Sequence, residues 1–163
     1  MSANLPASIS NQHEASFRAS EDFVTMTIAD QLFGIPVLQV QDVLGPQRIT
    51  RVPLAPVEIA GSLNLRGRIV TAVDVRVRLG LPPLVAGKSG MSIVVDLNDE
   101  LYSLMVDSVG EVLSLPSRSF ERSLSTMDPK WRDVSNGIYR LDGKLLITLD
   151  IARLLSFASL EAA

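Results

Sequence analysis

Apolar and polar residues alternate in short segments along most of this chain, and turn-forming residues separate the segments. Alternation with a period of two predicts strands, because successive side chains of a strand point to opposite faces. The pattern predicts strands at residues 22–29, 32–37, 47–52, 61–65, 68–73, 91–97, 101–106 and 109–115 and a further hairpin within 137–149. Short helical segments are predicted around residues 37–44, after residue 74 and at 151–157. Many short strands with few, short helices favour small barrels or sandwiches.

One hairpin, GSLNLRGRIVTAVDVRVRL at residues 61–79, is echoed as GIYRLDGKLLITLDIARLL at residues 137–155. Gly67 can adopt the positive φ of a tight turn, which places Arg66 at the tip with its guanidinium free to reach outward. Asp74 and its counterpart Asp150 are predicted N-caps, because a carboxylate there accepts unpaired amide hydrogens. Gly61 aligns with Gly137 in this echo.

A second echo relates FGIPVLQVQDVL at residues 33–44 to YSLMVDSVGEVL at residues 102–113. The two echoes occur in the same order, so the chain is predicted to contain two related halves. The second half carries several extra residues within 114–136, where prolines interrupt any regular pattern.

Composition limits the classes of function. The chain has 163 residues, of which 47% are hydrophobic, and each half is too small to be stable alone, so the halves are expected to share a core. It has no cysteine, which excludes disulfides and thiolate chemistry. No apolar run is long enough to span a membrane. Residues 1–21 are predicted to be a mobile tail, and His13, the only histidine, is best explained as a solvated residue within it.

Two other functions, catalysis and nucleic-acid binding, each have one feature of the sequence in their favour. Asp74 and Asp150 occur once in each half, as paired catalytic aspartates do, but a helix-start pattern follows each and favours capping. Neither a P-loop, a nucleophile elbow nor a metal-ligand cluster is present in the sequence. A cluster of arginines (Arg66, Arg68, Arg76 and Arg78) suggests nucleic-acid binding. The net charge of −3 and the aromatic content of 5% argue against it, so these arginines are expected at a solvated or partner-facing edge.

Three motifs carry a resemblance to a known family. The sequence NLRG at residues 64–67, followed by VDVR at 73–76, resembles the NLRG…(V/I)DLR signature of the CheW family of chemosensory adaptors. FGI at 33–35 with VQDV at 40–43, and VDSVGEV at 106–112, resemble two further family segments. The likeness runs from about residue 22 to 157. Thr71 stands where the family often has proline, and Asp42 where it usually has glutamate.

The resemblance implies an all-β fold of two five-stranded SH3-like barrels packed on a shared core, with a few short helices. The expected organisation is a tail at residues 1–21, a CheW-like domain at 22–157 and a short tail at 158–163. Within the domain, residues 22–86 are expected to form the first barrel half and residues 87–157 the second.

The resemblance also implies a non-enzymatic adaptor without cofactor or metal, which binds the regulatory domain of the chemotaxis histidine kinase CheA and the cytoplasmic tip of chemoreceptors. It implies a cytoplasmic protein at receptor arrays, with no nucleic-acid binding and no membrane insertion. Carried onto this sequence, the kinase-binding residues are Val40 and Asp42. The receptor-binding residues, in a groove between the barrels, are Gly61, Asn64, Leu65, Arg66, Val106 and Gly137.

Local physics leaves alternatives open at these positions. Leu63, Leu65 and Val106 would form an apolar trough for a helical hairpin, with Arg66 as a polar anchor. Gly61 and Gly137 either let a partner backbone approach closely or satisfy a bulge of their own strand. Arg66 is alternatively a solvated turn tip, and Val40 and Asp42 are alternatively a core residue and a cap.

Overall fold

The computed structural model describes residues 19–84, 90–122 and 127–157. These residues form two mainly antiparallel sheets. The six-stranded sheet has the order β8-β1-β2-β11-β10-β9, with β1 Ser20–Ile28, β2 Gln31–Pro36, β8 Ser108–Pro116, β9 Phe120–Glu121, β10 Ser135–Leu141 and β11 Lys144–Leu149. The five-stranded sheet has the order β3-β6-β7-β5-β4, with β3 Val40–Leu44, β4 Ile59–Leu65, β5 Arg68–Asp74, β6 Met91–Leu97 and β7 Glu100–Val106. The expected all-β class is therefore confirmed.

Within the described ranges, the helical segments are short and lie between or after strands. They are the 3-10 turns η1 Val37–Gln39 and η2 Ser117–Ser119 and the helices α2 Val75–Arg78, α3 Pro129–Arg132 and α4 Ile151–Leu154. Among the described residues, none of these helices is long and apolar enough to cross a bilayer. His13, the tail at 158–163 and nearly all of the tail at 1–21 lie outside the described residues.

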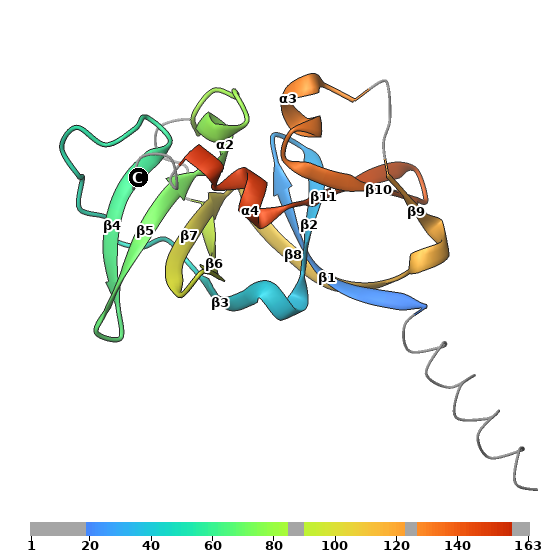
Figure 1. Cartoon of the computed structure of the whole chain (residues 1–163), viewed down its shortest axis with the longest axis horizontal. Coiled ribbons are helices and arrows are strands. Elements are labelled where there is room, and N and C mark those ends of the chain that lie inside the picture. The colour runs from blue at the N-terminus through green and yellow to red at the C-terminus, as the bar shows by residue number, and fades with distance from the viewer. Residues whose placement is uncertain (1–18, 85–89, 123–126, 158–163) are drawn as a thin grey trace, which may run out of the picture.

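Each sheet takes strands from both halves of the chain. Strands β1 and β2 join β8–β11, whereas β6 and β7 join β3–β5, as the mixed colours of each sheet show (Figure 1). The exchange uses two parallel pairings, β2 with β11 and β5 with β7. Residues 22–86 and 87–157 were each expected to form one barrel half. This is wrong, because each sheet contains strands from both ranges. The exchanged hairpins tie the halves together, as the size of each half requires.

Strand register bears out the duplicated sequence. Gly61 and Gly137 each lie at a bulge, with φ values of +152° and +154°. Asp74 Oδ1 accepts a hydrogen bond from the Val77 amide at 3.2 Å, and Asp150 Oδ1 accepts one from the Arg153 amide at 3.1 Å. Both aspartates are thus the predicted N-caps, of α2 and α4.

Two local predictions were wrong. The helical turn expected over residues 37–44 ends at Gln39, and residues 40–44 are strand β3, which pairs with β6. The strand expected at residues 47–52 is reduced to one bridge, in which Thr50 and Ser62 exchange two backbone hydrogen bonds of 2.8 Å. This bridge joins the segment after β3 to β4, which brings the two edges of the five-stranded sheet together.

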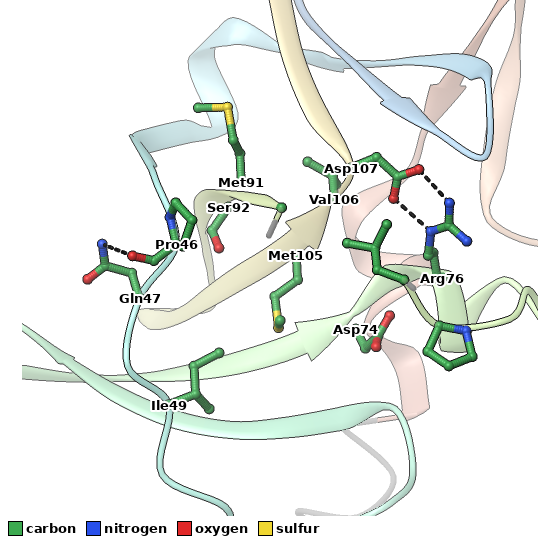
Figure 2. Close-up of a pocket in the computed structure, with 13 residues that line it drawn as sticks. Pro46, Gln47, Ile49, Asp74, Arg76, Met91, Ser92, Met105, Val106 and Asp107 are labelled. Atoms are coloured by element: carbon green, nitrogen blue, oxygen red, sulfur yellow. Dashed lines mark hydrogen bonds and ion pairs between the residues drawn. The ribbon is translucent and has the colours of Figure 1, made fainter. Parts of the chain in front are cut away.

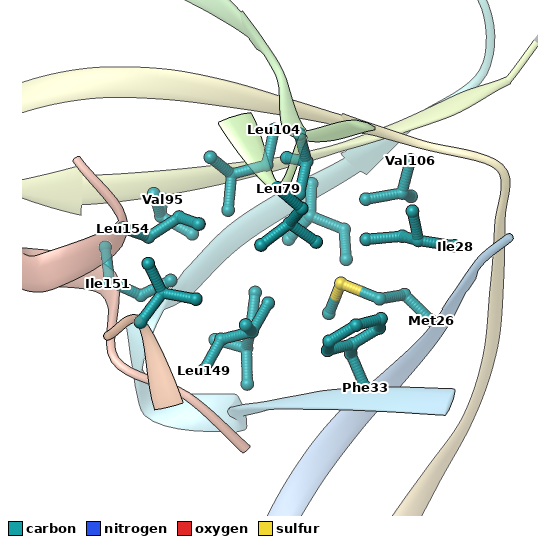
Figure 3. Close-up of a cluster of buried hydrophobic side chains, with 14 of the residues drawn as sticks. Met26, Ile28, Phe33, Leu79, Val95, Leu104, Val106, Leu149, Ile151 and Leu154 are labelled. Atoms are coloured by element: carbon teal, nitrogen blue, oxygen red, sulfur yellow. The ribbon is translucent and has the colours of Figure 1, made fainter. Parts of the chain in front are cut away.

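Three clusters of buried apolar side chains hold the structure together. The largest lies between the sheets and includes Met26, Phe33, Leu104 and Leu149 (Figure 3). A second cluster consists of side chains from the five-stranded sheet, around Leu63, Val70 and Val94. A third consists of side chains from the six-stranded sheet, around Phe23, Tyr139 and Leu146. The shared core expected from the sequence is therefore the cluster between the sheets.

One buried hydroxyl group has no partner, and its removal gives a stability prediction. Ser103 on β7 is 1% exposed, and its Oγ makes no hydrogen bond to any described residue. A buried polar group without a partner costs about 1–3 kcal/mol. Ser103→Ala is therefore expected to keep or raise the free energy of unfolding, measured by urea denaturation. Ser135→Ala is the control, because Ser135 Oγ donates to Gly137 O and accepts from Gly137 N, so its loss should destabilise.

Candidate partner-binding surfaces

The tip of the β4–β5 hairpin contacts the edge strand β3 through an ion pair. Arg66 and Gly67 have φ values of +51° and +86°, and Asn64 Oδ1 accepts a hydrogen bond from the Gly67 amide at 2.9 Å. Arg66 Nη2 lies 3.0 Å from Asp42 Oδ2, and the two side chains are 79% and 26% exposed. The expectation that the Arg66 guanidinium is free is therefore wrong. A residue predicted to face the kinase is paired with one predicted to face the receptor.

The two predicted kinase-facing residues have different environments. Val40 is half-buried and packs against the cluster between the sheets, opposite Val95 of β6. Asp42 Oδ1 accepts a hydrogen bond from the Val43 amide at 2.8 Å, while its other oxygen pairs with Arg66. Both residues lie on the edge strand β3, where the Asp42 side chain is 26% exposed.

The two predicted receptor-facing glycines are covered by the chain itself. A Cβ on Gly61 would lie closer than 3.0 Å to the Thr50 carbonyl, and a Cβ on Gly137 would lie equally close to the Glu121 carbonyl. Both glycines are buried, and they belong to different sheets. The close approach that they permit is made by the protein's own backbone, so of the two alternatives the structure favours the bulge.

The remaining receptor-facing residues do not form one continuous groove. Asn64, Leu65 and Arg66 lie together at the hairpin tip, where Asn64 is exposed and Leu65 is half-buried. Val106 is 2% exposed and lies at the end of β7, beyond the Asp74–Met105 pair and so at the opposite end of β5. Leu63 is also buried, so the expected trough of Leu63, Leu65 and Val106 is not an open surface.

A charged network that the sequence did not reveal lies where the two sheets meet. Arg76 donates to Asp107 with Nε at 2.7 Å and Nη2 at 2.6 Å (Figure 2). Its Nη1 donates to Pro82 O. Asp107 Oδ2 also accepts a hydrogen bond from the Ala29 amide at 2.8 Å. The hydrogen bond to Asp107, together with its negative charge, raises the pKa of Arg76 above its ordinary value. The network ties α2, the β7–β8 junction and the β1–β2 turn together.

A pocket of about 330 Å³ lies beside this network, at one end of the five-stranded sheet. Figure 2 shows Met105 near its centre, with Ile49 on one side and the Arg76–Asp107 pair on another. Its walls are the segment after β3, the start of β6 and the ends of β5 and β7, and its lining residues are Pro46, Gln47, Ile49, Asp74, Arg76, Pro83, Leu84, Gly90, Met91, Ser92, Met105, Val106 and Asp107. Among the described residues, no group of three acidic or imidazole side chains could hold a metal ion.

The ion pair between Asp42 and Arg66 is expected to contribute little to stability. An exposed pair is worth about 0.2–1 kcal/mol, because water screens it and two long side chains must be ordered. Asp42→Arg and Arg66→Glu should therefore each lower the free energy of unfolding by less than about 1 kcal/mol, measured by urea denaturation. A larger loss would mean that this pair holds the hairpin to β3.

The CheW-like domain family matches residues 22–159. The chain is 31% identical over 142 residues to a chemotaxis protein CheW of Klebsiella aerogenes, covering 83% of this chain and 82% of that protein. It is 25% identical over 162 residues to the CheW of Helicobacter pylori, covering 95% and 98%. Protein PilI of Pseudomonas aeruginosa is 25% identical over 147 residues, covering 90% of this chain and 79% of that protein.

A solved structure has the same architecture. The scaffolding protein TtCheW from Thermoanaerobacter tengcongensis superimposes with a TM-score of 0.71 at 29% sequence identity, covering 79% of this chain and 88% of that chain.

Proposed function

Because the chain belongs to the CheW-like domain family, we propose that it is a non-enzymatic adaptor that couples chemoreceptors to the chemotaxis histidine kinase CheA. The family match covers nearly all of the described residues, and proteins of this family act in chemotaxis as scaffolds. Its place would be the cytoplasm, at arrays of membrane-bound receptors.

The observation that best supports this proposal is the exposed junction between β3 and the β4–β5 hairpin. Asp42 lies on a sheet edge, and Arg66, Asn64 and Leu65 lie on a turn fixed by the Asn64 hydrogen bond. We propose that Asp42, with Val40 behind it, faces the kinase regulatory domain, and that the hairpin tip faces the receptor. Gly61, Val106 and Gly137 would act indirectly, because all three are buried and shape the strands that carry these surfaces.

The alternatives lose support from the same contacts. Asp74 and Asp150 each cap a separate helix and accept a hydrogen bond from an amide of that helix, so capping accounts for both carboxylates. Three of the four clustered arginines bind within the protein, and Arg66 does so through its exposed pair with Asp42. Arg76 pairs with Asp107, and Arg78 donates to the Leu154 and Arg153 carbonyls while its guanidinium lies 5.6 Å from the Phe157 ring centroid.

The proposed mechanism is bivalent binding by one rigid body. An adaptor transmits receptor state only if its contacts differ between signalling states. Both surfaces lie on the five-stranded sheet and meet at the Asp42–Arg66 ion pair, so a shift at one surface is carried to the other. Many weak contacts within an array would add avidity.

Binding of purified fragments tests the proposal. Wild type is expected to bind a CheA regulatory domain and a receptor hairpin fragment, each measured by calorimetry. Asp42→Arg should mainly weaken kinase binding and Arg66→Glu mainly receptor binding. Arg140→Glu is the matched control, because it breaks a comparable exposed pair, with Glu121 of the other sheet.

The double variant Asp42→Arg/Arg66→Glu separates two explanations of any loss. It restores an ion pair of reversed polarity but keeps the wrong charge toward each partner. If it binds as poorly as the single variants, the partners contact these charges directly. If wild type binds neither fragment at about tens of micromolar, an affinity of about 6 kcal/mol, the adaptor function is wrong although the family assignment holds.

A further inference from the structure

The two sheets pair their strands in equivalent ways, but side chains of different size occupy the equivalent ends. At the end of the six-stranded sheet, the rings of Phe23, Phe120 and Tyr139 pack together, with Tyr139 5.5 Å from Phe23 and 5.3 Å from Phe120 between ring centroids. The pocket that these three rings line is about 190 Å³. The equivalent end of the five-stranded sheet holds the larger pocket of about 330 Å³.

Strand register identifies the residues that stand in place of the three rings. Ser92 pairs with Leu44 as Phe23 pairs with Leu113. Leu63 pairs with Val70 as Tyr139 pairs with Leu146. Ile49 lies against Gly61 as Phe120 lies against Gly137. Each aromatic ring of one end therefore has a smaller counterpart at the other. Ser92 and Ile49, the counterparts of Phe23 and Phe120, line the pocket.

The pocket has the size and the walls to take a bulky apolar group. A cavity of about 150 Å³ is enough for a benzene ring. Met91 and Met105 line it, and unbranched thioether side chains adjust to the shape of an apolar guest and contact aromatic rings favourably. Among the lining residues that the structure describes, Arg76 is the one basic residue, against the two acidic residues Asp74 and Asp107, so these three leave one negative charge at the rim.

We propose that this pocket is a socket for one aromatic side chain of a protein partner, presented beside a basic residue. The ring would occupy the space that Phe23 and Phe120 fill in the other sheet, and the basic residue would face Asp74. The inference rests on the proposed adaptor function, which supplies the protein partner, but it names a surface on the opposite end of β5 from the hairpin tip.

Methyl NMR of the intact protein tests the socket without a partner. With methionine methyl groups labelled with carbon-13, N-acetyl-tryptophanamide is added in the millimolar range, and N-acetyl-alaninamide serves as the control compound. Saturable shifts of Met91 and Met105 are expected with the aromatic probe alone. Met26 and Met127, buried between the sheets, are internal references and should not shift. Absent shifts, or equal shifts of all four signals, would overturn the proposal.

Filling the pocket tests its use in binding. Ser92→Phe should abolish the response to the probe and weaken binding of the kinase or the receptor fragment at least tenfold. Ser108→Phe adds the same ring at an exposed position of β8 and should change neither. If Ser92→Phe does not fold, Ile49→Phe fills the same space from the segment after β3.

A folded, pocket-filled variant that binds both fragments as wild type does overturns the inference but leaves the adaptor function standing. Failure of wild type to bind either fragment overturns the adaptor function. The NMR titration then still tests whether the pocket binds an aromatic group.

Discussion

Gly61→Ala is expected to lower the free energy of unfolding by about 3 kcal/mol or more, because a methyl group there collides with backbone and cannot be relieved by a rotamer change. The added Cβ would lie within 3.0 Å of Thr50 O, and 2.6 Å from Ile49 Cγ2. The clash would break the Thr50–Ser62 bridge, which joins the edges of the five-stranded sheet. Urea denaturation followed by circular dichroism measures the loss.

Gly67→Ala is the matched control. Gly67 also has a positive φ, +86°, but nothing lies within 4 Å of where its Cβ would be. Only the left-handed conformation then opposes alanine, at a cost of about 1–2 kcal/mol. If Gly61→Ala is no less stable than Gly67→Ala, the contact with Thr50 is not as close as the structure shows. A receptor-binding defect of a Gly61 variant must therefore be interpreted together with its stability.

Asp107→Ala is expected to be the second large loss, about 2–4 kcal/mol. The Arg76 and Asp107 side chains are only 18% and 19% exposed, so removing the carboxylate leaves a poorly solvated guanidinium without its bidentate partner. The Ala29 amide loses its acceptor at the same time. The measurement is again urea denaturation, because the loss should appear as a lower midpoint with an unchanged slope.

Glu121→Ala provides the comparison for Asp107→Ala. Its partner Arg140 is 61% exposed and Glu121 is 40% exposed, so this pair should contribute less than about 1 kcal/mol. Equal losses for the two variants would show that the Arg76–Asp107 network adds nothing beyond an ordinary surface ion pair.

Local features of this fold could be predicted from the sequence. The hairpin turn at Gly67, the caps Asp74 and Asp150, and the strand at residues 91–97 follow from short-range rules about φ, capping and alternation. The duplication was also visible, because aligned glycines and aspartates keep the same local roles in both halves. Residues 40–44 misled the prediction, since their apolar spacing fits a helical turn as well as an edge strand.

Long-range features could not be predicted in this way. The exchange of hairpins between the sheets depends on the parallel pairings of β2 with β11 and of β5 with β7, and periodicity within a strand does not specify its neighbour. The pairs Asp42–Arg66 and Arg76–Asp107 join separate elements, so no spacing rule brings them together. The proposed socket depends on a size difference between equivalent positions of the two sheets, for example Ser92 and Phe23, and strand register rather than local sequence makes these positions equivalent.

Contact between Asp42 and Arg66 makes simultaneous binding the decisive question for an adaptor, because two partners that use adjacent residues can also compete. The most direct measurement is analytical ultracentrifugation of the protein mixed with a CheA regulatory domain and a receptor hairpin fragment. The adaptor account predicts one complex that contains all three proteins. It also predicts that the two fragments do not form a complex with each other when this protein is omitted. Displacement of one partner by the other, with only binary complexes formed, would contradict it.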